Sequence, residues 1–171
     1  MSKQKITGTN LESWIHLLES KNGVARLKAR TSLVALGRSS VPSLIRVLQN
    51  SKQDHVRWEA AKTLGAIGDV RSIPALVSAL EDSDQGVVWL AAEALRKFKK
   101  IAWPQLMRAL VNSKPDSVLL RHGAHHVLRN QKEAGFNDLL STLRIALESS
   151  TSSESTPFAA SHILKRVKTK S

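Results

Sequence analysis

The sequence predicts an all-α fold, a right-handed α-α superhelix (α-solenoid) of about five two-helix hairpins. A proline motif recurs at residues 42, 74 and 104, that is, at intervals of 32 and 30 residues. An amphipathic helical pattern follows each copy, so that two kinds of helix alternate along the chain. One hairpin of this size cannot bury its own apolar stripe, and stacked hairpins must therefore share one continuous core.

The first helix of each hairpin, here called the A helix, begins at a proline. The sequence around Pro42 is Val-Pro-Ser-Leu-Ile-Arg-Val-Leu, and similar segments surround Pro74 and Pro104. Proline suits the first turn of a helix because its missing N–H has no helical partner there. Leucines two and six residues after each proline lie on one helix face. Weaker copies without proline occur around Trp14 and at 139–143.

The second helix, the B helix, carries an apolar stripe at helical spacing. In the segment 54–68, apolar or small residues fall at positions 0, 4, 7, 8 and 11 counted from Val56, and Gly68 is suited to end the helix. The same stripe predicts B helices at residues 25, 87 and 120 and, less regularly, at 156. In the middle three copies we expect one leucine of the stripe in the shared core: Leu64, Leu95 and Leu128.

The second hairpin resembles the HEAT-like repeat of phycobilin lyase proteins and many prokaryotic scaffold proteins. The resemblance rests on the run Asp54-x-Val56-Arg57-x-x-Ala60-Ala61-x-x-Leu64-Gly65, followed by Ile73-Pro74-Ala75-Leu76. It is strongest over residues 39–100 and weak beyond 131. It implies that the B helices line an inner, concave surface and that the A helices lie outside.

The same resemblance implies a structural role for the arginine that follows the first residue of the stripe. This arginine recurs as Arg26, Arg57 and Arg121, and in HEAT repeats it pairs with an aspartate of the neighbouring repeat. Asp54 is the aspartate in register for that pairing. We therefore expect these arginines to hold repeats together rather than to bind a ligand.

A single domain over residues 9–168 is predicted, with flexible ends at 1–8 and 169–171. Thr9 and Glu12 have the spacing of a capping box and mark the start of the first helix. A Ser/Thr-rich connector at 149–153 lengthens the last hairpin. The expected hairpins lie at about 9–38, 39–70, 71–101, 102–132 and 135–168.

Composition excludes several kinds of site and protein. The chain has no cysteine, which excludes disulfides, thiolate metal sites and thiol nucleophiles and fits a cytoplasmic location. The N-terminus lacks the apolar segment of a signal peptide. No stretch approaches the roughly 18 apolar residues that span a bilayer, so membrane insertion is not expected.

The charge indicates an anionic partner. The net charge is +12, and it is uneven: residues 1–85 have 12 basic and 8 acidic side chains, whereas residues 86–171 have 14 and 6. Such a field attracts nucleic acid, anionic lipid or an acidic protein surface. The alternative is a basic surface that keeps the protein in solution without a specific partner.

Two rows of residues mark the face on which the B helices would bind that partner. Rings occur two positions after the start of the stripe on four of five hairpins: Trp58, Trp89, His122 and Phe158. Cations occur nine positions after it in the C-terminal half: Arg96, Arg129 and Lys165. The two rows share one helix face, where stacking and charge neutralisation could combine. The alternative is that the tryptophans fill the gap between adjacent B helices.

The histidines do not predict a metal site. His122 and His126 have the i, i+4 spacing of metal ligands, and His162 could lie near His126 on the next hairpin. However, the segment contains no H-E-x-x-H arrangement and no nearby carboxylate. We expect partly exposed histidines that become charged below neutral pH. Neither a metal nor a small-molecule cofactor is predicted.

The first functional hypothesis is a non-catalytic binding scaffold. Its basic, aromatic-lined concave groove would engage an acidic protein segment or nucleic acid. The alternative is a HEAT-fold enzyme, such as a DNA-base glycosylase or a phycobilin lyase or isomerase, with Glu93 or Glu59 as the carboxylate beside a tryptophan, where its pKa could be raised. A third hypothesis is protein assembly through the exposed faces of the A helices.

Overall fold

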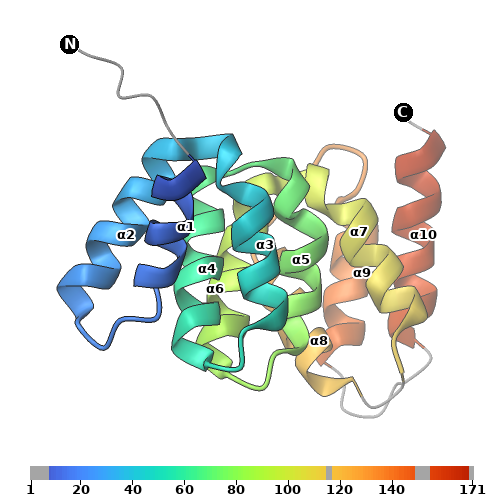
Figure 1. Cartoon of the computed structure of the whole chain (residues 1–171). Helices are drawn as coiled ribbons and strands as arrows, with labels where there is room; N and C mark the ends of the chain where they lie inside the picture. The colour runs from blue at the N-terminus through green and yellow to red at the C-terminus, as the bar shows by residue number, and fades with distance from the viewer. Residues whose placement is uncertain (1–7, 115–116, 149–154, 170–171) are drawn as a thin grey trace.

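The computed structural model describes residues 8–114, 117–148 and 155–169, and every regular element in these ranges is a helix (Figure 1). The A helices of the first four hairpins are α1 (Gly8–Leu17), α3 (Val41–Asn50), α5 (Ile73–Ser78) and α7 (Trp103–Asn112). Their B helices are α2 (Gly23–Leu36), α4 (Asp54–Ile67), α6 (Gln85–Phe98) and α8 (Val118–Leu128). The last hairpin consists of α9 (Asn137–Glu148) and α10 (Ser155–Thr169).

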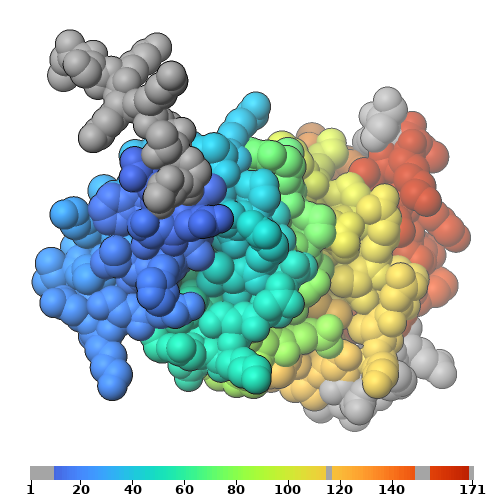
Figure 2. Space-filling model, in the orientation of Figure 1, coloured from blue at the N-terminus to red at the C-terminus, as the bar shows by residue number. Residues whose placement is uncertain are grey.

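The helices stack in two layers. Helices α2, α4, α6 and α8 contact one another in that order, and α3, α5 and α7 contact one another on the other side. In the space-filling view the chain therefore forms successive bands from one end of the molecule to the other (Figure 2). Each hairpin contacts its neighbours rather than distant hairpins, as an α-solenoid does. We call the two sets of helices the B layer and the A layer.

The A helices begin where the proline motif places them. Helices α3, α5 and α7 start at Val41, Ile73 and Trp103, one residue before each proline, so the proline lies in the first turn. Helix α5 is short because its last turn continues as a 3-10 helix over Ala79–Glu81. The leucines of the motif are buried in the core: Leu44, Leu48, Leu76, Leu80, Leu106 and Leu110.

The B helices pack closely because their stripe contains small residues. Leu64, Leu95 and Leu128 are fully buried. A Cβ atom added at Gly65 would lie 2.8 Å from the Cβ atom of Ala94, which is closer than two carbon atoms can approach. Helices α4 and α6 therefore meet almost backbone to backbone at this point.

The fifth hairpin does not continue the two layers as predicted. Helix α9, expected as an A helix, packs against α8, whereas α10, expected as a B helix, packs against α7 and α9. The ring of Phe136 in the α8–α9 connection is fully buried, with its centroid 5.6 Å from that of Trp103 in α7. Helix α9 therefore extends the B layer and α10 closes the A layer. The assignment of α10 to the B layer was wrong because the apolar spacing of a helix does not encode which neighbour it contacts.

The predictions for the chain ends and the connector at 149–153 fall largely outside the described residues. Gly8 and Thr169, expected in flexible ends, are the first residue of α1 and the last of α10. Helix α1 thus begins one residue before Thr9. Within the described ranges no helix is long and apolar enough to cross a membrane.

Candidate functional site

The two tryptophans of the predicted row differ in their surroundings. The Trp58 ring is half-buried against the start of α6, where its Cδ1 atom would lie 3.0 Å from a Cβ atom at Gly86. The Nζ atom of Lys62 lies 4.3 Å from the centroid of the same ring. Trp58 therefore fills the gap between α4 and α6, as the packing alternative expects. Trp89 on α6 is 56% exposed.

Trp89 belongs to a small cluster that joins α6 and α8. Its ring centroid lies 4.1 Å from that of His126, and the two planes are tilted by 41°. His126 Nε2 lies 2.6 Å from Glu93 Oε1, and Arg96 Nη1 donates to the same oxygen over 2.7 Å. His122, the predicted member of the row, is exposed on α8. The histidine that meets the tryptophan is thus His126, one helical turn further along.

The carboxylates considered for catalysis both belong to ion pairs. Glu59 is buried and accepts hydrogen bonds from Arg26 and Arg30 over 3.1 and 2.6 Å. Burial raises the pKa of Glu93, but the hydrogen bonds from Arg96 and His126 outweigh this effect, so its pKa lies below the ordinary value. The place of Glu93 beside Trp89 therefore does not raise its pKa, because the hydrogen bonds from Arg96 and His126 stabilise the ionised form more than burial opposes it.

The arginines at the start of the B helices join neighbouring repeats. Arg57 donates to both carboxylate oxygens of Asp82, over 2.7 and 2.8 Å, and to the backbone oxygen of Ser51. Arg26 pairs with Glu59 in the same way between α2 and α4. Their partners are therefore not Asp54, whose carboxylate accepts from the backbone N–H of His55. Arg121 makes no ion pair within the part of the chain that the structure describes.

The structure does not bring Phe158 and Lys165 into the row. Both lie exposed on α10, which packs against α7 and α9 rather than α8. The Phe158 ring lies 4.5 Å from the ring of His162, centroid to centroid. The row of rings and the row of cations on the B layer therefore end at α8. The physical reason is the exchange of layers in the fifth hairpin.

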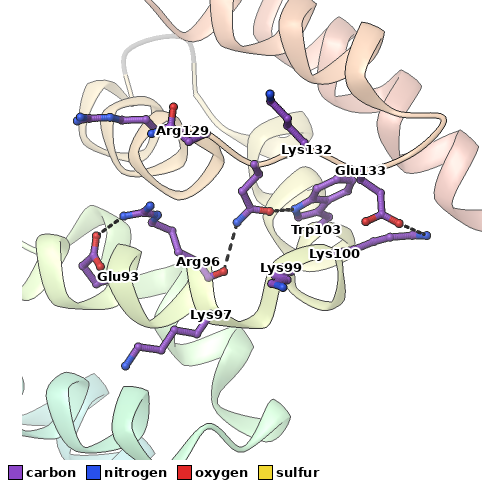
Figure 3. A pocket seen from close by; sticks show the side chains of 11 residues that line it. Glu93, Arg96, Lys97, Lys99, Lys100, Trp103, Arg129, Lys132 and Glu133 are labelled. Atoms are coloured by element: carbon purple, nitrogen blue, oxygen red, sulfur yellow. Dashed lines mark hydrogen bonds and ion pairs between the residues drawn. The ribbon is translucent and has the colours of Figure 1, made fainter.

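Arg96 and Arg129 line the same basic cavity of about 590 Å³ near the C-terminal ends of α6 and α8 (Figure 3). Six cationic side chains and two carboxylates line it, which leaves an excess of four positive charges. The cations come from α6, the turn after it, and the α8–α9 connection. They are Arg96, Lys97, Lys99, Lys100, Arg129 and Lys132, and the carboxylates are Glu93 and Glu133.

Gln131 holds the α8–α9 connection in place beside the cavity. Its side-chain oxygen accepts from Trp103 Nε1 over 3.0 Å. Its amide nitrogen donates to the backbone oxygen of Val127 over 3.0 Å and to that of Arg96 over 3.4 Å. One side chain thus joins α6, α7 and α8. The wall of the cavity is therefore fixed before any ligand arrives.

Three cations of the cavity stay available to a ligand. Arg96 pairs with Glu93, Lys100 with Glu133, and Lys97 donates to the backbone oxygen of Gly65. Among the described residues, no hydrogen bond or ion pair occupies the side chains of Lys99, Arg129 and Lys132. All three are exposed.

The helical period of the B helices predicted Arg129 as a site residue, but it did not predict Lys99 or Lys132. Both residues lie outside the stripe, in turns that have no helical period to mark them. For Lys99 a signal was present: it follows Gly37 and Gly68 at a constant interval of 31 residues, at the position that ends each B helix. For Lys132 we find no such signal.

On α8, His125 and His126 each bond to a carboxylate, whereas His162 on α10 lies against Phe158. His125 Nε2 lies 2.9 Å from Glu148 Oε1, between α8 and α9. Within the described ranges, no three His, Asp or Glu side chains are placed to hold one metal ion.

Comparison with known proteins gives three findings. A family model described as HEAT repeats matches residues 11–96. A HEAT repeat-containing taxis protein of Halobacterium salinarum is 38% identical over 89 residues, which is 50% of this chain and 21% of that protein. The match therefore spans about a fifth of that relative's length. The solved complex of CpcE and CpcF of phycocyanin lyase from Nostoc sp. PCC7120 superposes with a TM-score of 0.57 at 19% identity, covering 92% of this chain and 99% of that one. At this identity the likeness concerns the fold alone.

Proposed function

This chain belongs to the HEAT-repeat family, and from that premise we propose that it is a non-catalytic scaffold whose B layer binds an acidic segment of a partner protein. The observation that carries the proposal is the concentration of unpaired cations beside α6 and α8. Stacked hairpins leave an extended surface that suits a protein ligand. Lys99, Arg129 and Lys132 give one part of that surface a positive field.

An acidic protein segment fits this surface better than a nucleic acid does. A strand that followed the predicted row from α8 to α4 would meet carboxylates beside Trp58, where Asp54 and Asp84 line another hollow. Nucleic-acid binding without sequence preference relies on successive exposed rings. In this row Trp58 is half-buried, and one face of Trp89 is tilted against His126. The positive field is thus local rather than continuous.

The carboxylates favour a scaffold over an enzyme. A glycosylase-like mechanism needs a carboxyl group that can give or take a proton near neutral pH. The lowered pKa of Glu93 keeps it ionised and bonded to Arg96 and His126. Glu59 is buried beneath two arginines. Both carboxylates therefore act as anchors between helices.

Fluorescence anisotropy with labelled peptides tests the proposal. The probes are a peptide with eight Asp and Glu residues, a neutral peptide of equal length, and a single-stranded oligonucleotide with eight phosphates. We expect the acidic peptide to bind tightest, with an affinity that falls as salt increases. Arg129→Gln weakens this binding by about fivefold or more, since a charge-assisted contact is lost.

The matched control is Lys21→Gln, which removes one exposed positive charge far from the cavity. If the two variants weaken binding equally, the attraction comes from net charge and not from this surface. Tighter binding of the oligonucleotide would contradict the choice of a protein partner.

A further inference from the structure

We propose that the basic cavity is a binding site for a phosphoryl group, carried by a phosphorylated side chain of the acidic partner segment. The identity of that partner rests on the proposed function. The existence of the anion site does not, because it follows from the geometry of the cavity itself.

The unpaired charge of the cavity matches a dianion. Lys99 belongs to the turn after α6, Arg129 directly follows α8, and Lys132 belongs to the α8–α9 connection, yet all three line one cavity (Figure 3). A carboxylate supplies a single negative charge, whereas a phosphoryl group supplies nearly two and three acceptor oxygens. The planar guanidinium of an arginine also fits a phosphoryl group with two parallel hydrogen bonds. Three free cations therefore suit a phosphoryl group better than a single Asp or Glu.

The backbone at Lys99 is an independent sign of function. Lys99 has φ 50° and ψ −135°, almost the values of Gly37 at the equivalent turn, which are 59° and −130°. This positive-φ region is one that side-chain-bearing residues rarely adopt and that glycine adopts readily. A glycine would suit the turn after α6 as it does the turn after α2. A lysine there is disfavoured by the backbone, and its contribution to the cavity offers a reason for its presence.

The cavity is also held in shape without a ligand. Gln131 bonds to Trp103, to Val127 and to Arg96, which fixes the segment between Arg129 and Lys132. The Lys100–Glu133 pair, at 3.2 Å, ties the same segment to the turn after α6. Binding therefore does not have to order the backbone that carries the three cations.

The charges beyond the cavity favour a phosphorylated peptide over a nucleic acid. One cavity accommodates one phosphoryl group, whereas a nucleic acid carries one at every nucleotide. Neighbouring phosphates that followed the B layer would meet Asp54 and Asp84 beside Trp58. A peptide with a single phosphoryl group avoids this repulsion.

Backbone-amide NMR titrations of the full chain test the proposal at constant ionic strength. Four probes are used: inorganic phosphate, an acidic peptide with one phosphoserine, the same peptide with serine, and an oligonucleotide of equal charge. We expect saturable shifts from inorganic phosphate at the amides of 96–100 and 129–133. The phosphoserine peptide should bind about tenfold more tightly than the serine peptide, as hydrogen bonds between charged groups imply.

Two variants remove cavity cations in different ways. Lys99→Gly removes a cation and gives the turn its preferred residue, so the fold is retained and the effect on binding is interpretable. Lys132→Gln removes a second cation from an exposed position. We expect each to abolish most of the tenfold preference for the phosphoserine peptide, whereas the Lys21→Gln control keeps it.

The outcomes separate this inference from the proposed function. Equal affinity for the two peptides overturns the phosphoryl site but leaves the acidic-segment scaffold standing. Saturable phosphate binding at 96–100 and 129–133 without binding of either peptide supports the anion site and overturns the scaffold. If inorganic phosphate shifts amides near all surface lysines rather than those of the cavity, the proposed site is overturned. If the oligonucleotide shifts the same amides and binds more tightly than the phosphoserine peptide, the choice of a phosphorylated protein is overturned.

Discussion

The two halves of the solenoid use their basic residues differently. Around α2 and α4, arginines join one repeat to the next: Arg26 and Arg30 hold Glu59, and Arg57 holds Asp82. Around α6 and α8, cations gather at a cavity in which three of them have no partner among the described residues. Net charge alone therefore does not locate a binding surface. What locates it is the place where several cations that do not join repeats gather at one cavity.

The hydrophobic core, unlike the basic residues, is the same in the two halves. The largest expected loss of stability, from shortening a core leucine in each half, tests this. Leu64 on α4 and Leu95 on α6 occupy equivalent, fully buried positions in one continuous cluster. Leu64→Ala and Leu95→Ala should each lower the free energy of unfolding by about 2–5 kcal/mol, through lost burial and a residual cavity. Urea denaturation measures both. The ring of Trp89 is mostly exposed. If Leu95→Ala lowered the free energy of unfolding by less than Trp89→Ala does, the C-terminal half would be packed differently.

Removing an arginine should cost more stability in the N-terminal half, where it forms an ion pair, than at the cavity in the C-terminal half. Arg57→Ala removes the two hydrogen bonds that Arg57 donates to the largely buried carboxylate of Asp82, and we expect a loss of about 2–3 kcal/mol in the free energy of unfolding. Arg129→Ala removes an exposed, unpaired side chain and should change stability by less than about 0.5 kcal/mol. Thermal melts of the two variants check this. Similar losses would contradict the division between joining and binding arginines.

The two equivalent turns should respond in opposite directions. Lys99→Gly relieves a positive-φ lysine and should stabilise the protein by about 1 kcal/mol, while Gly37→Lys introduces the same strain and should destabilise it by about 1–2 kcal/mol. Chemical denaturation of both variants provides the measurement. If Lys99→Gly proves destabilising, the lysine side chain stabilises the turn, and the argument for a ligand-binding purpose is lost.

Acid should remove the stabilisation that Asp69 gives to the connection between α4 and α5, and this is the smallest of these effects. Hydrogen bonds from Arg71 lower the pKa of Asp69 from 3.8 to about 2. Because the folded pKa is below the unfolded one, this stabilisation is complete above about pH 4 and is lost as the pH falls toward 2. Unfolding midpoints of the wild type and Asp69→Asn, measured from pH 5 to 2, should therefore converge as the pH falls. A constant difference over that range would contradict the assigned pKa.

The sequence was sufficient for the repeats and their family because these depend on local patterns. Proline placed the starts of α3, α5 and α7 within one residue, and the stripe with Leu64 and Leu95 identified the buried face of the B helices. Both signals arise within a single helix, from backbone geometry and helical period. The match of a HEAT-repeat model to residues 11–96 confirms the family that those motifs indicated.

Tertiary structure decided which residues meet. Helix α10 has an apolar face like that of a B helix, but it packs against α7, next to the buried contact between Phe136 and Trp103. Phe158 and Lys165 on α10 therefore lie outside the predicted row. Likewise, Lys99, Arg129 and Lys132 lie in the connections that follow α6 and α8, and they line one cavity only because these two helices are adjacent. Amphipathic spacing determines that a face is buried, because burial needs only apolar residues in register. The choice of neighbour depends on contacts between segments far apart in the chain, and the sequence pattern of one helix does not contain them.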